Sequence, residues 1–471
     1  MDEAFKQALE KVLAREVPEF TALTGCTQLT AGASQETYCV TLTTRSEGET
    51  KLALRRTQPS ADPAISVGGI SLETEAIRFE VAGEHNVPGP EVIYVLQPQD
   101  NLGDGFLMQW LQGETLGQRI VKAPELAEVR PKLARQCGEI LGRIHAIDWQ
   151  SAGLDDKLPT IEPAKLVQET WAYYRDFNVP VPMIDYCMRW LMDNLPTSHR
   201  LCLVHGDFRN GNLMVTPEGV NAVLDWELAQ IGDPVRDLGW LCTHSWRFGC
   251  DELAVGGFGR IDDLLAGYAA GGGCAVAPDH LHFWQVFGSF WWAVGCLRMA
   301  DQFRHGPDRS VERPAIGRRS SECQADCVNL LIPGPVARGE ADPGGESDAN
   351  LPRNDELLDS VAAFLREDAA AATSGRTRFF TRVAANSLTI VKRELALGPA
   401  HRQAERARLM ALLDRTDSLD ALRRQLTSGL RDGSIALDRP QLREHLRASV
   451  INQLAIDQPT YAALATAIAG D

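Results

Sequence analysis

The residues best suited to catalysis lie in one stretch, Leu203 to Trp240, with the sequence LVHGDFRNGNLMVTPEGVNAVLDWELAQIGDPVRDLGW. It contains His205-Gly-Asp207 and, five residues after the aspartate, Asn212. Phosphoryl transfer needs a carboxylate that orients or deprotonates the acceptor hydroxyl, metal ions that neutralise the phosphates, and cationic or N–H donors. Asp207 supplies the carboxylate, and the amide oxygen of Asn212 suits a hard metal such as magnesium. The stretch therefore predicts a phosphoryl-transfer centre.

A predicted hairpin adds a second carboxylate to this centre. Two short apolar runs flank Pro217-Glu-Gly219, and Asp225 follows the second run, where it could reach the same metal ions. Each piece alone is weak, because His-Gly-Asp is usually a turn and an aspartate that ends a strand is commonly a cap. The combination of H-x-D-x-x-x-x-N, a hairpin and D-W-E makes coincidence improbable. Glu227 could serve as an outer metal ligand, whereas Asp233 is more typical of a turn before proline.

The segments before this stretch predict a small N-terminal lobe. Alternating apolar residues indicate strands, and apolar residues at helical spacing indicate helices. The loop Ala31 to Ser34 could bring backbone N–H groups to phosphates, although with one glycine it is more often a tight turn. Glu75 can face the strand that carries Arg55. The predicted elements are a helix over 1–20, a strand within 27–42 that is entered through the loop, a strand over 51–56, a helix over 71–80, and strands over 92–96 and 106–111.

Helices dominate the rest of the chain. His145, on a predicted helix over 133–149, fits a packed, hydrogen-bonded role better than a catalytic one. Two helices over 165–195 follow, and the aromatic-rich helices from 246 to 304 are typical of core packing, with some side chains available to line an acceptor pocket. A Pro- and Gly-rich segment over 333–350 predicts a linker. Asn354 is then the expected cap of the first of several further helices.

Composition restricts the class of protein. A chain of 471 residues is expected to form two or three domains. The net charge of -16 argues against binding to nucleic acid or to anionic lipid. The eleven scattered cysteines predict reduced thiols, and a metal site at Cys323 and Cys327 is improbable because no second pair accompanies them. With no signal peptide and no membrane-spanning run, a cytoplasmic location is expected.

On the pattern from His205 to Asp225, the chain resembles the aminoglycoside phosphotransferase family, small-molecule relatives of the protein kinases, over about residues 20–330. The resemblance implies an α+β, bilobal protein-kinase-like fold. It also implies that Asp207 is the catalytic base, that Arg209 assists the moving phosphoryl group, and that Asn212 and Asp225 bind Mg²⁺. By the same likeness, His205 and Asp237 brace the catalytic loop.

The resemblance also implies a site for ATP. The loop with Gly32, Ala33 and Ser34 would cover the nucleotide, and Arg55, paired with Glu75, would stand where kinases usually have lysine. Arginine keeps the charge but has a broader, planar head. The adenine would be held by backbone groups of the segment that contains Gln109, Trp110 and Leu111.

The stretch VLDWELAQIGDPVRDLGW resembles a branch of the family whose kinase-like domains are fused to acyl-CoA dehydrogenases in some organisms. This likeness suggests a hydroxyacyl or organic-acid acceptor, in agreement with the aromatic helices and with Arg247, Arg260, Arg298 and Arg304. The alternatives are an antibiotic kinase and a nucleotide-binding regulatory module without turnover. The expected domains are an N-lobe (1–111), a C-lobe (112–332) and, after the linker, a separate all-helical domain (351–471), which either joins two chains or covers the cleft.

Overall fold

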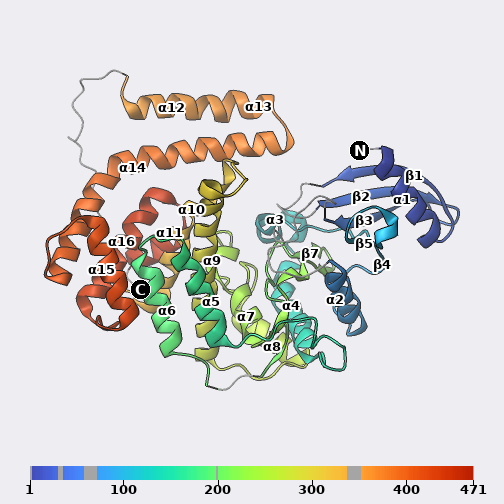
Figure 1. The fold of residues 1–471 in the computed structure, drawn as a ribbon, viewed down its shortest axis with the longest axis horizontal. Coiled ribbons are helices and arrows are strands. Elements are labelled where there is room, and N and C mark those ends of the chain that lie inside the picture. Colours follow the sequence, from blue (N-terminus) through green and yellow to red (C-terminus); the bar gives the residue numbers. More distant parts are fainter. Residues whose placement is uncertain (1–2, 30–35, 58–71, 198–199, 337–351, 470–471) are drawn as a thin grey trace. The chain divides into compact units, whose positions relative to one another are not determined.

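The computed structural model describes residues 3–29, 36–57, 72–197, 200–336 and 352–469 (Figure 1). These residues pack into two compact units. The first contains residues 1–161, 199–242 and 246–277, and the second contains residues 162–198, 243–245 and 278–471. Each unit is therefore built from segments that are distant in the sequence.

The first unit begins with a five-stranded antiparallel sheet of order β1-β2-β3-β5-β4. Alternation of apolar and polar residues along β2 and β3 places Val40, Leu42, Leu52 and Leu54 in the core, as expected for half-buried strands. The strands are β1 (Phe20–Gln28), β2 (Glu36–Thr44), β3 (Gly48–Arg56), β4 (Val92–Val95) and β5 (Gly105–Gln109).

Two helices flank this sheet. The buried residues Leu9, Val12 and Leu13 of α1 (Glu3–Glu16) pack against apolar residues of the strands, including Leu54. Successive side chains of a strand point to opposite faces, so Arg55 faces away from this core. It forms an ion pair with Glu75 of α2 (Leu72–Glu84), with Nε and Oε2 3.2 Å apart. The sheet thus presents one cation toward α2.

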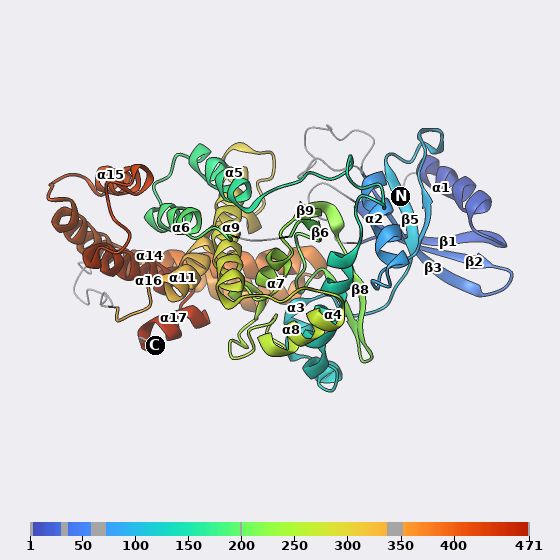
Figure 2. The same cartoon turned by 90° about the horizontal axis from the view of Figure 1, so that it is seen from below.

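The rest of the first unit is a helical body with two small strand pairs. α4 (Arg130–Ala146) and α8 (Ile261–Ala270) approach closely because glycines lie at their contact: a Cβ atom added at Gly138 would lie 2.1 Å from the carbonyl oxygen of Leu264. Figure 2 shows these elements from below. They are α3 (Gly117–Lys122), α4 (Arg130–Ala146), β6 (Cys202–Val204), β7 (Leu213–Thr216), β8 (Gly219–Val223), β9 (Gln230–Gly232), α7 (Val235–Leu241) and α8 (Ile261–Ala270).

Among its described residues, the second unit contains helices and connecting loops but no strand. Its helices are α5 (Pro163–Asp176), α6 (Pro182–Asp193), α9 (Pro278–His305), α10 (Glu312–Arg318), α11 (Ser320–Leu331), α12 (Asn354–Phe364), α13 (Ala370–Ala372), α14 (Gly375–Leu413), α15 (Leu419–Asp432), α16 (Pro440–Asp457) and α17 (Ala462–Ala469).

The helices after residue 351 pack closely against helices that precede residue 332. Arg431 of α15 forms an ion pair with Asp185 of α6, whose side chain is fully buried. The hydroxyl of Tyr461 donates to Asp326 of α11 at 2.9 Å. The C-terminal helices therefore share a compact unit with α5, α6 and α9–α11, whereas the domain boundaries predicted from the sequence stay predictions.

The predicted α+β class is confirmed, with an antiparallel N-terminal sheet, a helical body and further C-terminal helices. Two details differ from expectation. Strand β1 lies in a segment where no strand was predicted. Asn354 is the first residue of α12 rather than its cap; Arg353 occupies the cap position, and its backbone N–H donates to Glu356. No helix along the described residues has the length and apolar character needed to cross a bilayer.

Candidate active site

The loop that carries the predicted catalytic residues, 205–212, connects β6 to β7. β6 pairs with β9, and β7 pairs with β8, so the loop is fixed at both ends by strands. The backbone N–H of Leu224 donates to the carbonyl of Asn212 at 2.8 Å, which ties the end of the loop to the segment leading to Asp225. The sequence-predicted carboxylates and amide are thereby brought into one region of the first unit.

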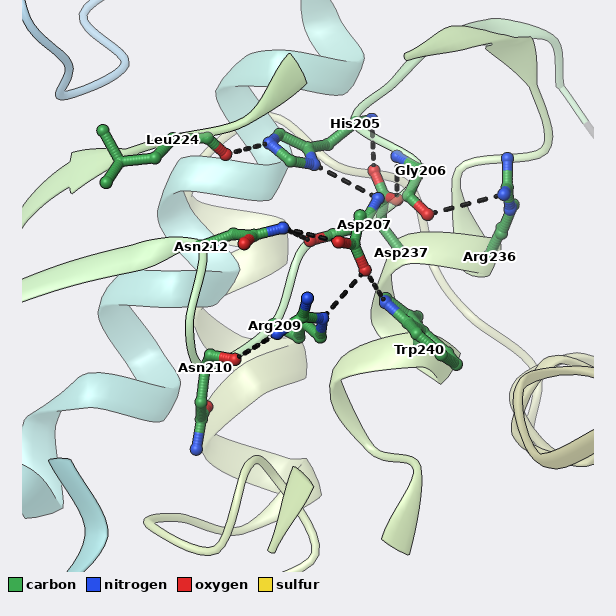
Figure 3. A network of polar contacts seen from close by, with 10 residues as sticks. All are labelled: His205, Gly206, Asp207, Arg209, Asn210, Asn212, Leu224, Arg236, Asp237 and Trp240. Atoms are coloured by element: carbon green, nitrogen blue, oxygen red, sulfur yellow. Dashed lines mark hydrogen bonds and ion pairs between the residues drawn. The ribbon is translucent and has the colours of Figure 1, made fainter. Parts of the chain in front are cut away.

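Asp207 lies at the centre of this loop and is 9% exposed (Figure 3). Its Oδ1 accepts hydrogen bonds from Nε of Arg209 at 3.0 Å and from Nε1 of Trp240 at 2.7 Å. Its Oδ2 accepts from Nδ2 of Asn212 at 2.6 Å. Three donors therefore fix the orientation of one nearly buried carboxylate, as a general base requires.

The partners of Asp207 are themselves held in place. Nδ2 of Asn212 also donates to the carbonyl of Asp207 at 3.0 Å, so its Oδ1 is the atom left for a metal ion. The guanidinium of Arg209 lies over the ring of Trp246, 4.5 Å from its centroid, and Nη1 donates to the carbonyl of Asn210. Arg209 can therefore supply positive charge beside the carboxylate.

Asp237 holds the start of the loop through hydrogen bonds to its backbone. Its Oδ2 accepts from the backbone N–H of His205 at 2.7 Å and its Oδ1 from that of Gly206 at 2.8 Å. Burial alone would raise the pKa of Asp237, but the hydrogen bond and charge of His145 hold that pKa below its ordinary value. The bracing contacts expected of Asp237 are therefore present.

His205 and His145 have structural contacts, as expected. His205 is fully buried and lies between the carbonyl of Leu224, 3.0 Å from Nε2, and the backbone N–H of Asp207, 3.2 Å from Nδ1. Burial lowers the pKa of His205. His145 lies between Asp237 and the hydroxyl of Tyr268.

Asp225 has a backbone conformation that non-glycine residues rarely adopt, with φ of 64°. Its Oδ1 lies 2.8 Å from Nη2 of Arg55, so Arg55 bridges Asp225 and Glu75. Strained residues of this kind cluster at functional sites, where surrounding contacts hold them. The predicted pairing of Arg55 with Glu75 is thus present, and a contact with Asp225 adds to it.

Glu227 and Glu75 complete an acidic cluster around Arg55. Burial and then the charge of Asp225 raise the pKa of Glu227 to about 7. Burial raises the pKa of Glu75 to about 7, even though Arg55 opposes the change. Both raised pKa values show that burial disfavours the charged forms of these carboxyl groups, and a divalent cation beside them would favour the charged forms again.

We expect Glu227→Gln to flatten the pH dependence of stability. A carboxyl group whose folded pKa is raised binds its proton more tightly in the folded state, so stability falls as pH rises from about 4.5 to above 7. The variant should match the wild type near pH 4.5 and exceed its free energy of unfolding by on the order of 2 kcal/mol at pH 8. Urea unfolding at several pH values measures this difference, and the exposed Glu218→Gln should leave the profile unchanged. Parallel wild-type and Glu227→Gln profiles would contradict the assignment.

The oxygen donors of Asn212, Asp225 and Glu227 suit Mg²⁺, which prefers carboxylate and carbonyl oxygen. Within the ranges that the structure describes, no three His, Cys, Asp or Glu side chains form a ready-made metal cluster. The predicted site differs from such a cluster because one predicted ligand is an amide and because Asp225 forms an ion pair with Arg55. These residues fit a metal that arrives together with phosphates rather than one bound permanently.

Comparison with known proteins identifies the family. Residues 25–274, more than half of the chain, match the phosphotransferase enzyme family. The chain belongs to this family. Residues 371–461 match a domain of unknown function, DUF6285. A solved structure of a candidate aminoglycoside phosphotransferase from Ralstonia eutropha superposes with a TM-score of 0.56 at 22% identity, covering 68% of this chain and 96% of that protein. This likeness confirms the protein-kinase-like fold expected from the sequence.

Two similar proteins with curated descriptions are named as members of the acyl-CoA dehydrogenase family. Acyl-CoA dehydrogenase family member 10 of Mus musculus is 32% identical over 224 residues, which is 46% of this chain and 20% of the relative. Member 11 of Rattus norvegicus is 29% identical over 246 residues, 50% of this chain and 30% of the relative. The chain thus spans between a fifth and a third of the length of these two relatives.

The structure places only some of the remaining predicted nucleotide contacts. Gly32, Ala33 and Ser34 lie outside the described residues. Gln109 ends β5, opposite Leu52 of β3, and Trp110 and Leu111 follow it. The chain then reaches the β7–β8 hairpin, where the backbone N–H of Glu114 donates to the carbonyl of Val215 at 2.8 Å. This segment therefore connects the sheet to the catalytic body, and its contact with adenine stays a prediction.

Two site residues were not predicted from the sequence. Trp240 donates to Asp207, but a tryptophan in an apolar helix is indistinguishable from core by its pattern alone. Arg78 of α2 is 1% exposed and donates from Nη1 to the carbonyl of Trp226, and burial lowers its pKa to about 10. Its spacing of three residues from Glu75 on α2 is the signal that could have suggested a shared face.

The four arginines proposed near the acceptor are divided between the two units. Arg247 is 7% exposed and donates to the backbone carbonyls of Cys242 and Asp251, which is a structural role. Arg260 belongs to the first unit, whereas Arg298 and Arg304 belong to the second. Most of the aromatic side chains beside them are buried, as expected for core packing.

Proposed function

We propose that this protein is an ATP-dependent kinase that transfers the γ-phosphoryl group to a hydroxyl of a hydroxyacyl thioester or hydroxy acid. The observation that carries the proposal is the carboxylate of Asp207, nearly buried and oriented by three donors beside the amide of Asn212. Membership of the phosphotransferase family supports the reaction type.

The chemistry follows from the positions of these side chains. Asp207 accepts the proton of the acceptor hydroxyl while the acceptor oxygen forms a bond to the γ-phosphorus. The bond between that phosphorus and its bridging oxygen breaks, and ADP leaves. Arg209, beside the carboxylate, stabilises negative charge on the moving group. Bound Mg²⁺, held by Asn212, Asp225 and Glu227, would neutralise the phosphates.

The acceptor class is the finer part of the proposal. The curated relatives are named acyl-CoA dehydrogenase family members, which supports an acyl acceptor. The alternatives are an antibiotic kinase and a regulatory module that binds nucleotide without turnover. The eleven cysteines are all free thiols, which supports a reducing, cytoplasmic location.

One assay separates these functions. Purified protein with ATP and Mg²⁺ is offered 3-hydroxyacyl-CoAs, free hydroxy acids of the same chain length, and aminoglycosides, with Asp207→Asn as the control. We expect ADP release to rise with a hydroxyacyl acceptor and to stop when EDTA removes the metal. Stimulation by an aminoglycoside alone would favour the antibiotic kinase. If no acceptor exceeds the Asp207→Asn level while ATP still binds, the regulatory function gains and the kinase proposal fails.

We further propose that two copies associate through the α12–α14 hairpin, formed by α12 and the first half of α14. These helices run side by side in Figure 1. Six large apolar side chains of the hairpin are 44–58% exposed: Leu357, Val361, Phe364, Phe379, Val391 and Leu395. α12 carries acidic residues and the first turns of α14 carry arginines, so a copy related by a two-fold axis can place opposite charges together.

We expect the mass measured by light scattering to correspond to a dimer and Phe364→Glu to yield a monomer. Burying a charge at such an interface is unfavourable, whereas the same change at a free surface is nearly neutral. Ile468→Glu is the matched control, since Ile468 is 44% exposed on α17, outside the hairpin. A monomeric wild type at all concentrations, or equal dissociation by both variants, would exclude this interface.

A further inference from the structure

A cavity of about 220 Å³ lies among the helices of the second unit. Its walls come chiefly from α14 and α16, with contributions from α11, α15 and the segment that begins α6. Pro399 interrupts the hydrogen bonding of α14, and the preceding residue, Gly398, borders the cavity. We call this cavity the α14–α16 pocket. None of its lining residues belongs to the phosphoryl-transfer site.

Two of the three arginines that line the pocket are neutralised by glutamates. Arg423 forms a bidentate ion pair with Glu405, with N–O distances of 2.7 and 2.5 Å. Nη1 of Arg402 lies 2.6 Å from Oε1 of Glu394. Each of these pairs uses one cation and one anion of the lining, so together they contribute little net charge.

Arg408 is the third arginine of the lining, and it forms no such ion pair with a glutamate. Its Nη2 donates to the hydroxyl of Ser449 at 3.2 Å, and its Nε is buried without a hydrogen-bond partner. Among the ion pairs of the described residues, none includes Arg408. Arg408 is therefore the one arginine of the lining without an ion pair among the described residues, although Glu405 and Glu444 are near enough to act on its charge.

His445 is the second unusual group in the lining. It is 1% exposed, and neither ring nitrogen has a hydrogen-bond partner. Burial and the nearby charges of Arg408 and Arg423 lower its pKa to about 3, so the ring is neutral near pH 7 and has one N–H donor. A buried polar group without a partner costs about 1–3 kcal/mol, and most such groups in proteins are hydrogen-bonded. A ligand in the pocket would supply the missing partner.

The remaining walls are partly apolar and include Met183, Leu446, Val450 and Ile456. The volume corresponds to roughly seven water molecules at about 30 Å³ each. A single arginine without an ion pair, beside two glutamates, favours a monoanion over a doubly charged phosphate, because the glutamates repel the second charge.

We propose that the α14–α16 pocket binds a small aliphatic monocarboxylate. The carboxylate contacts Arg408 and the N–H of His445, and the hydrocarbon chain lies against Leu446 and its apolar neighbours. Most residues that line the pocket belong to the domain of unknown function, residues 371–461. The proposal therefore gives that domain a class of ligand.

Calorimetric titration of the 471-residue chain tests this assignment. The probes are butyrate, the isosteric but uncharged butyramide, and inorganic phosphate. We expect saturable binding of butyrate, at least tenfold weaker binding of butyramide, and no binding of phosphate. Arg408→Gln should weaken butyrate binding at least tenfold, because the charge-assisted contact is lost. Arg382→Gln, an exposed arginine on the same helix, should leave it unchanged.

A second variant, His445→Leu, distinguishes loss of the binding site from loss of folding. It removes a buried group that lacks a partner, so the ligand-free variant should have a melting temperature equal to or above that of the wild type while losing butyrate binding. Absence of saturable butyrate binding at millimolar concentrations would overturn the proposal. Equal binding of butyramide, a preference for phosphate, or the same loss in Arg408→Gln and Arg382→Gln would overturn it as well.

Discussion

Replacement of Asp207 by asparagine is expected to lower the rate of phosphoryl transfer by about 100- to 10,000-fold, the range that a positioned general base contributes. The change keeps the size of the side chain and removes the group that accepts the proton. Affinity for nucleotide measured without Mg²⁺ should change little, since the residues proposed to contact the nucleotide are not among the hydrogen-bond partners of Asp207. Steady-state kinetics and binding of a fluorescent ATP analogue measure the two effects separately.

The neighbours of Asp207 add a second consequence of this substitution. The carboxylate accepts from Arg209, Trp240 and Asn212 and donates to none of them. An amide nitrogen at Oδ2 would face Nδ2 of Asn212, so two donors would meet. If the amide of Asn212 turned to relieve this contact, its oxygen would point at residue 207 instead of at the metal. We therefore expect a higher Mg²⁺ requirement in Asp207→Asn.

Two comparisons make this prediction specific. Trp240→Phe removes one donor and keeps the carboxylate, so we expect a loss of about tenfold, equivalent to one weakened hydrogen bond of about 1.4 kcal/mol. Asp262→Asn changes an exposed aspartate at the start of α8 and should leave activity unchanged. An Asp207→Asn enzyme with more than a tenth of wild-type activity would exclude Asp207 as the base.

Asp237→Asn is expected to reduce the free energy of unfolding by about 3–5 kcal/mol, as when one partner of a buried, hydrogen-bonded charge is removed. Asp237 is fully buried and accepts hydrogen bonds from two backbone N–H groups and from His145. Asparagine offers one oxygen, and its NH₂ group would oppose one of these donors. The cost is large because no water can replace the lost acceptor.

Urea unfolding followed by circular dichroism measures this loss. Asp262→Asn serves again as the control, and it should unfold at the wild-type urea midpoint, because exposed substitutions change stability by less than about 0.5 kcal/mol. A loss below about 1 kcal/mol in Asp237→Asn would show that the loop of His205 and Gly206 is supported by other contacts.

The elements predicted best from the sequence are those with strong local patterns. The alternation from Tyr38 to Leu42 and the helical spacing of Leu9, Val12 and Leu13 indicate β2 and α1 directly. Strand β1 was missed because most of its residues are exposed or half-buried, so no apolar alternation marks it. Packing of the C-terminal helices against α6 and α11 depends on partners such as Asp185 and Arg431, which are 246 residues apart, and no local pattern encodes it.

The site was predictable to the extent that it lies in consecutive residues. The order of Asp207, Asn212 and Asp225 indicated the chemistry, and the contacts of His205 and Asp237 follow the roles that the family resemblance implied. Trp240 and Arg78 were missed because their partners, Asp207 and Trp226, are distant in sequence. The bridge from Arg55 to Asp225 spans 170 residues and could be found only in three dimensions.

That bridge has a thermodynamic consequence for how substrates assemble. The guanidinium of Arg55 contacts both Glu75 and Asp225. If Asp225 were a ligand of Mg²⁺, part of that guanidinium would be free to contact phosphate oxygens. Metal and nucleotide would therefore each raise the affinity of the protein for the other, by the same factor in both directions. Under this linkage, the arginine that stands in place of the usual lysine would hold Asp225 in an ion pair until metal and nucleotide bind together.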